Sequence, residues 1–298
     1  MNNDFVKIPI CASLICVLLI SGCSGNTSSA PNEISVASVA ESAAAEPFPA
    51  MSCGVRLESA PERVVSLSPA ATEIICELGF KERLVGISDY CDYPEGLKAE
   101  RVGSTENPDT DAILKLKPDA VFTLSALSER ETYALNQVNV AVLTAQPPRS
   151  LEEYSALYKE TAAAFYGKET DGTEKDAQKA VKIGAAARAA LEKAASGVKL
   201  ENFLYVTEKL TAAGADTFES AVLSLSGKNV CKETGYAALD KISGAPKFIV
   251  AASSLTEEML KENETLRGFI EGGAQIKFVN AEAFERPSAR TASVFVAN

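Results

Sequence analysis

The sequence predicts an α/β protein of two lobes, each with a parallel sheet, joined by one long backbone helix with a cleft between the lobes. Three observations predict this fold. Short apolar runs alternate with helical segments up to residue 143, a stretch without strand signals follows, and the alternation returns after residue 203. Strands separated by helices at this spacing pair in parallel through crossover helices. The 298 residues are enough to bury two cores.

The N-terminal α/β lobe is expected at residues 56–150. Its first strand is the apolar run 64–67, and Pro69 then opens a helix that Ser68 caps and Gly79 ends. The alternation continues with further strands and helices, which are expected at residues 84–87, 111–116, 120–124, 128–137 and 140–143.

A helical linker is expected at residues 151–198. Residues 151–166 form one helix, and residues 174–195 are rich in Ala and Lys, which favour a second. At 1.5 Å per residue the second helix spans about 33 Å, roughly the width of a small domain. A rigid helix of this length limits hinge closure, and the cleft between the lobes is the natural place for a ligand.

The C-terminal α/β lobe is expected at residues 199–298. Its helix 217–225 ends at Gly227, and its strands are expected at residues 203–207, 247–251 and 276–279.

The N-terminus has the pattern of a targeting signal. An apolar run at residues 8–20 follows Lys7 and is too short to span a bilayer. The run ends in Ile20-Ser21-Gly22-Cys23, which resembles the lipobox of bacterial lipoproteins. This resemblance implies a lipoprotein signal peptide at residues 1–22 and lipidation of Cys23; the alternative is a buried helix that contains a cysteine. Residues 23–55, mostly small and polar, are expected to form a flexible tether that holds the body outside the bacterial cell membrane.

Composition excludes several kinds of function. A net charge of −11 argues against binding nucleic acid or lying on anionic lipid. The chain has no histidine, which removes the commonest metal ligand and the commonest general base. No nucleophile elbow, Walker or dinucleotide-binding motif occurs, so no enzyme and no cofactor are expected. The spacing of the four cysteines in the body leaves their disulfide state open. They are Cys53, Cys76, Cys91 and Cys231.

Six segments together resemble a known family, the helical-backbone periplasmic binding proteins that bind cobalamin or ferric siderophores for ABC importers. They are RVVSLSPAATE (63–73), LVGISDYCDYP (84–94), LKLKPD (114–119), AGADTF (213–218), LSGKNV (225–230) and FERPSAR (284–290). The resemblance implies a monomeric binding protein that holds a metal chelate, a corrinoid or ferric siderophore, between its lobes and delivers it to a permease.

The resemblance also implies which residues bind the ligand. Ala70 follows the first strand at a turn that faces the cleft, and Tyr90 packs on a bulky ligand face unless it is a turn-packing tyrosine. Tyr93 lies in the same segment, Glu282 occupies an acidic position of the cobalamin binders, and Arg286 is a cleft arginine. The alternative for the arginine is a surface salt bridge, for example with the neighbouring Glu285. No bare metal ion is expected as ligand, because the branch of the family that binds one uses histidine.

Two aspartates are implied to dock on the permease. Asp111 and Asp240 stand in helices where the family carries an acidic residue that pairs with permease arginines. The alternative is an ordinary aspartate at a helix start, which the helix dipole favours.

The ligand itself stays open. The corrinoid binders commonly have aromatic residues at the positions that here carry Thr105, Leu124 and Leu210. Because these aromatic residues are missing, a ferric siderophore or haem is also possible as the ligand. A different class of function, a lipid-anchored hydrolase or adhesin on a similar two-lobed frame, is the alternative to transport.

Overall fold

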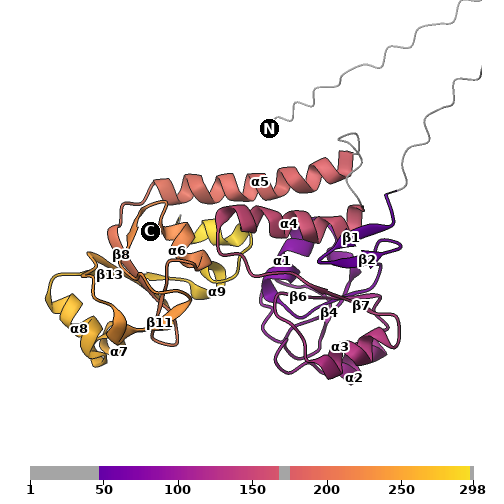
Figure 1. The fold of residues 1–298 in the computed structure, drawn as a ribbon, viewed down its shortest axis with the longest axis horizontal. Coiled ribbons are helices and arrows are strands. Elements are labelled where there is room, and N and C mark those ends of the chain that lie inside the picture. Colours follow the sequence, from indigo (N-terminus) through magenta and orange to yellow (C-terminus); the bar gives the residue numbers. More distant parts are fainter. Residues whose placement is uncertain (1–46, 168–174, 296–298) are drawn as a thin grey trace, which may run out of the picture. The chain divides into compact units, whose positions relative to one another are not determined.

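The computed structural model describes residues 47–167 and 175–295. They confirm the predicted class: two α/β lobes lie next to each other, and two packed helices run along one side of both (Figure 1). The signal peptide, Cys23 and most of the tether lie outside the described residues. Within those residues, no helix combines the length and the apolar character that crossing a bilayer requires.

The N-lobe is a five-stranded sheet in the order β5-β4-β3-β6-β7, with every neighbouring pair parallel. Adjacent residues of β3 point to opposite faces: Val64 packs in one core cluster with α1 and with α4 (Leu151–Tyr166), and Val65 packs in another with α2 and α3. The elements are β3 Val64–Ser66, α1 Pro69–Glu77, η1 Lys81–Arg83, β4 Leu84–Ile87, β5 Glu100–Arg101, α2 Thr110–Lys115, β6 Ala120–Thr123, α3 Glu129–Asn136 and β7 Ala141–Thr144.

The C-lobe sheet has six strands and mixes directions. Strands β8, β10, β12 and β13 pair in parallel, and β9 and β11 add an antiparallel edge. The elements are β8 Glu201–Val206, β9 Thr211–Ala213, α6 Phe218–Leu223, β10 Gly227–Asn229, β11 Tyr236–Ala238, η2 Leu239–Lys241, β12 Phe248–Ala252, α7 Glu257–Glu262, α8 Glu264–Glu271, β13 Gln275–Val279, α9 Ala281–Phe284 and η3 Ala289–Phe295.

The predicted tether ends before residue 55. Strands β1 (Ala50–Ser52) and β2 (Val55–Leu57) form an antiparallel hairpin, and the Ser52 hydroxyl donates to the Glu160 carbonyl at 3.0 Å. Burial of Ala50, and of Leu57 in the N-lobe core, offsets the cost of ordering this short segment.

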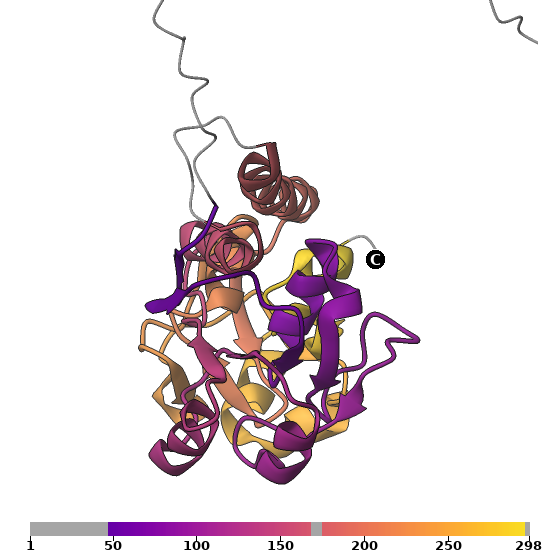
Figure 2. The ribbon, with the colours of Figure 1, turned by 90° about the vertical axis from the view of Figure 1, so that its right-hand side faces the viewer.

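The linker helices join the two lobes. Helix α4 (Leu151–Tyr166) has the predicted bounds, and α5 (Lys175–Ser196) lies along it, as both views show (Figure 2). One continuous cluster of buried side chains links the lobes through these helices. Its members include Ile74 of α1, Tyr154 of α4, Leu191 of α5, Phe203 of β8 and Phe284 of α9. The lobes therefore share part of their core, which resists a large hinge motion.

The described cysteines form no disulfide. Cys91 and Cys231 are buried thiols, and Cys53 and Cys76 are half-buried ones. Burial raises the pKa of each of these thiols, to about 12 for Cys76.

The shared core predicts that α5 stabilises the fold through one face only. Leu191 is buried on that helix, whereas Val181 is 43% exposed. Leu191→Ala is expected to lower the free energy of unfolding by about 3 kcal/mol, because it opens a cavity. Val181→Ala is the matched control and should change stability by less than about 0.5 kcal/mol. Chemical denaturation measures both; equal losses would show that α5 does not pack through the Leu191 face.

Candidate functional site

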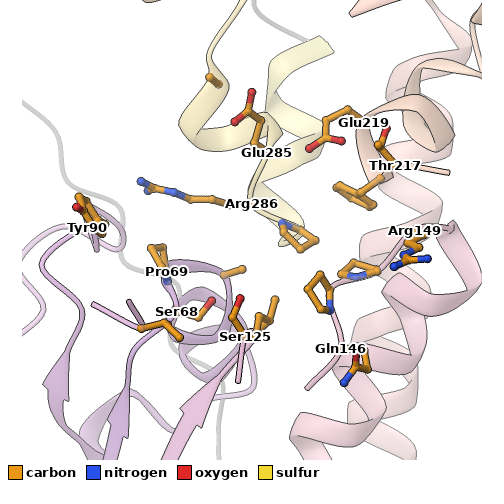
Figure 3. Close-up of a pocket in the computed structure, with 18 of the residues that line it drawn as sticks. Ser68, Pro69, Tyr90, Ser125, Gln146, Arg149, Thr217, Glu219, Glu285 and Arg286 are labelled. Atoms are coloured by element: carbon orange, nitrogen blue, oxygen red, sulfur yellow. The ribbon is translucent and has the colours of Figure 1, made fainter. Parts of the chain in front are cut away.

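A cavity of about 810 Å³ lies between the lobes. Its walls come from three parts of the chain: N-lobe loops that follow the strands, the linker before α4, and C-lobe segments around α6, β11 and α9 (Figure 3). The residues that Figure 3 labels are Ser68, Pro69, Tyr90, Ser125, Gln146, Arg149, Thr217, Glu219, Glu285 and Arg286. Because carboxyl ends of parallel strands commonly form ligand crevices, the position of this cavity suits a binding site.

The N-lobe wall contains two predicted residues. Ala70 lines the cavity in the first turn of α1, after Ser68 caps that helix by accepting a hydrogen bond from the Ala71 N–H at 3.4 Å. Tyr90, which follows β4, also lines the cavity and is 65% exposed. A tyrosine ring left this open at a cavity mouth is available to pack on a ligand face.

The C-lobe wall depends on a close approach of two backbone segments. The Gly214 N–H donates to the Gly235 carbonyl at 2.7 Å, and a Cβ at position 214 would lie 2.2 Å from the Glu233 carbonyl oxygen. Only glycine fits there. This contact places Thr217, the cap of α6, and Tyr236 of β11 in the same wall.

Two tyrosine–carboxylate pairs stand in or behind this wall. The Tyr236 hydroxyl donates to Glu219 at 3.0 Å, and the Tyr205 hydroxyl donates to Glu285 at 2.7 Å. Burial raises the pKa of Glu219 to about 7 and raises the pKa of Glu285 as well. Both tyrosine hydroxyls are therefore occupied by hydrogen bonds to the carboxylates. Burial raises the pKa of each tyrosine.

Arg286 lines the cavity, and its ion-pair partner is not Glu285. Its guanidinium donates to Asp92 of the N-lobe, and Figure 3 shows the side chain extending toward the Tyr90 side of the cavity. The salt bridge considered from the sequence exists, with a different partner. Glu282 also lines the cavity and hydrogen-bonds Asp92, which raises the pKa of Glu282. Partial burial acts to raise the pKa of Asp92, and its bonds to Glu282 and the arginines outweigh this and lower it to about 2.

The segment after Arg286 connects the C-lobe to α1 through hydrogen bonds and an ion pair. Glu73, which is fully buried, accepts hydrogen bonds from the Ser288 hydroxyl and from the Arg290 guanidinium at 2.8 Å. Glu77 accepts from the Ala289 N–H at 3.2 Å and from the Tyr158 hydroxyl. Arg290 also reaches Asp92 at 3.3 Å. These residues, the interlobe network, cross from one lobe to the other beside the cavity.

Three predicted residues lie away from the cavity. Tyr93 does not line it: its ring packs under the Arg290 guanidinium, 4.9 Å from the ring centre, and borders a second cavity on the N-lobe. Asp111 is exposed in the first turn of α2, and Asp240 is exposed in the 3-10 turn η2 instead of the α-helix that the sequence suggested.

Several lining residues were not found from the sequence. They are chiefly Arg149 and Glu153 at the start of α4, Glu106 in the N-lobe, and Glu208, Asp216 and Tyr236 in the C-lobe. The AGADTF segment was a signal for the α6 wall, and the Pro147-Pro148 pair marked the linker. Across residues 47–167 and 175–295, no cluster of three or more Cys, Asp or Glu is arranged to hold a metal ion.

Comparison with known proteins identifies relatives. The profile of a family described as "Periplasmic binding protein" matches residues 64–246. A vitamin B12-binding protein of Vibrio cholerae is 36% identical over 111 residues, which cover 37% of this chain and only 36% of that relative. A vitamin B12-binding protein of Pectobacterium atrosepticum is 27% identical over 236 residues, 76% of this chain and 77% of the relative.

Solved structures share the fold. The periplasmic vitamin B12-binding protein of Vibrio cholerae has a TM-score of 0.59 and 23% identity over 79% of this chain and 94% of that one. The periplasmic haem-binding protein of Vibrio cholerae has a TM-score of 0.65 and 16% identity over 78% and 96%. At these identities the likeness supports the two-lobed architecture alone.

Glu219 predicts a pH dependence of stability. Its pKa in the folded protein is about 7, against 4.5 for an ordinary glutamate, so the folded state favours the protonated form. The resulting stabilisation is complete below about pH 4.5 and is lost as pH rises through 7. Between pH 5 and 8, the free energy of unfolding of the wild type should fall by roughly 2 kcal/mol more than that of Glu219→Gln. Denaturant titrations at both pH values measure this, and parallel profiles would contradict it.

Proposed function

Because this chain belongs to the periplasmic binding protein family, we propose that it is an extracytoplasmic solute-binding lipoprotein of an ABC importer. It captures a metal chelate, a corrinoid or a ferric siderophore, in the cleft and delivers the chelate to the permease. The observation that carries the proposal is the cavity of about 810 Å³ with walls from both lobes. A volume in this range suits a large small-molecule ligand.

The relatives support this ligand class. Two of them are named vitamin B12-binding proteins, and a haem-binding protein shares the fold. Another relative, from Bacillus subtilis, is named an uncharacterized ABC transporter substrate-binding lipoprotein and is 31% identical over 129 residues, 43% of this chain and 40% of the relative. Binding without turnover is expected, because all these names describe binding proteins.

The lining of the cavity suits a bulky ring system. Tyr90 and Tyr236 stand on opposite lobes with 65% and 56% of their surfaces exposed, and Phe218 and Leu124 add apolar surface. Arg286 offers the guanidinium N–H groups that Asp92 leaves unused to a ligand oxygen. We assign Ala70, Tyr90, Glu282 and Arg286 to the ligand site.

Membrane attachment through lipidated Cys23 completes the proposal. The lipobox-like Ile20-Ser21-Gly22-Cys23 supports it, and the Bacillus relative carries the word lipoprotein in its name. The acyl chains would hold the protein at the outer face of the membrane, close to the permease.

Tyr90 provides the test of ligand binding. Tyr90→Ala should weaken binding of the chelate by about tenfold, because the ligand loses the tyrosine ring on which it stacks. Tyr133→Ala is the matched control: Tyr133 is 66% exposed on α3 and lies outside the cavity lining. Calorimetric titration with a corrinoid, haem, and hydroxamate and catecholate ferric siderophores measures the affinity. If none of these chelates binds the wild type, the proposed function is wrong.

Asp111 provides the test of permease docking. Its carboxylate is exposed on α2, at the end of the N-lobe remote from α4 and α5 (Figure 1). Asp111→Arg and Asp240→Arg should each reduce uptake of the chelate at least about tenfold, because the reversed charge repels permease arginines. Ligand affinity should stay unchanged. Uptake of labelled chelate by cells that carry only the variant measures the effect; undiminished uptake would remove the residue from the docking surface.

A further inference from the structure

The cleft lining carries an excess of negative charge. Among the described residues that line the cavity, seven are acidic and two are basic. The acidic ones come from both lobes and the linker, so every wall contributes: Glu106, Glu153, Glu208, Asp216, Glu219, Glu282 and Glu285. A narrow space between low-dielectric walls of one sign of charge concentrates the field on whatever occupies it.

The two arginines do not neutralise this excess. Arg286 is paired with Asp92, which lies beside the cavity and brings its own negative charge. Arg149 stands next to Glu153, whose carboxylate accepts a hydrogen bond from the Arg149 backbone N–H at 2.7 Å. Each arginine thus has an acidic residue beside it, and the lining holds six acidic residues besides Glu153.

Protonation reduces the excess without reversing it. The pKa values of Glu219, Glu282 and Glu285 are raised, so these three are the carboxyl groups that protonate first. With all three neutral, four of the seven acidic residues still face two arginines. The sign of the cleft is therefore negative in either state.

The hydrogen-bonding character of the C-lobe wall agrees with its charge. The hydroxyls of Tyr205 and Tyr236 donate to Glu285 and Glu219, so these phenol donors are already used within the wall. The exposed carboxylates of Glu208 and Glu282 leave acceptor oxygens at the cavity. Such a surface accepts hydrogen bonds. A ligand whose periphery carries N–H groups, as primary amides or amines do, can satisfy these acceptors, whereas a periphery of carboxylate or catecholate oxygens cannot.

We propose that this cleft selects its chelate by charge: it binds neutral or cationic chelates with N–H groups on their periphery and rejects polyanionic ones. The inference rests on the proposed function and narrows its ligand class to amide-bearing corrinoids and hydroxamate-type ferric chelates. Haem, with two propionates, and ferric tris-catecholates, which are triply anionic, belong to the rejected class. Like-charge contact of this kind lowers affinity for the wrong ligand more than it raises affinity for the right one.

The test uses ligand pairs that differ in charge and little else. One pair is a ferric trihydroxamate with a terminal amine and the same chelate succinylated on that amine; the other is cyanocobalamin and its tricarboxylate derivative. Calorimetric titration of the wild-type protein should give at least about tenfold tighter binding of the amine and amide forms, a difference that shrinks as salt screens the charges.

A variant locates the effect in the cleft. Glu106→Gln, Glu208→Gln and Glu282→Gln combined remove three exposed carboxylates from the lining. This triple variant should reduce the discrimination within each pair about fivefold or more. The matched control combines Glu62→Gln, Glu262→Gln and Glu271→Gln, which are exposed and lie outside the lining. The control changes the net charge equally and should leave the discrimination unchanged.

The outcomes separate this inference from the proposed function. If the succinylated and carboxylate forms bind as tightly as their partners, charge selection is wrong while chelate binding stands. If both triple variants change the discrimination equally, the effect comes from the net charge of the protein and the cleft is not its source. If no member of either pair binds and the chelates named above also fail to bind, both proposals are wrong.

Discussion

The bonds from the C-terminal segment to the buried Glu73 of α1 set the geometry of the cleft. A carboxylate taken out of water must be fully hydrogen-bonded, and here Ser288 and Arg290 supply its partners from the opposite lobe. Separating the lobes would break these bonds. Together with the core cluster shared through α4 and α5, this requirement keeps the two walls at a fixed separation. A cleft whose walls are held in this way needs little ordering when it is occupied.

The longer elements were predictable because their signals are local. Ser68 followed by Pro69 marks the start of α1, and the sequence gives the bounds of α4 as the structure has them. Strands β5, β9, β10 and β11 were missed because these two or three residues show neither an alternating pattern nor the run of large apolar residues that marks β3. The β1–β2 hairpin was taken as tether for the same reason, and its order comes from contacts with the N-lobe that the local sequence does not carry.

Residues of the candidate site could be predicted only where they lie in or next to segments that resemble the family. Ala70, Tyr90 and Arg286 stand in segments that resemble the family, and Glu282 lies two residues before one of them; all four line the cavity. Tyr93 stands in the same segment as Tyr90 yet packs against Arg290, since three residues of an irregular loop suffice to turn a side chain away. The partnership of Asp92 with Arg286 and the pairing of Glu219 with Tyr236 join residues far apart in sequence, and only the fold brings them together.

The free thiols of the described residues bear on how the protein responds to oxidants. Disulfide exchange and oxidation proceed through the thiolate, and the raised pKa values of Cys76, Cys91 and Cys231 keep each sulfur protonated at neutral pH. A smaller thiolate fraction slows the reaction of these three sulfurs with oxidants and foreign disulfides. Burial thus gives these thiols a kinetic protection from the mixed disulfides that an oxidising compartment favours.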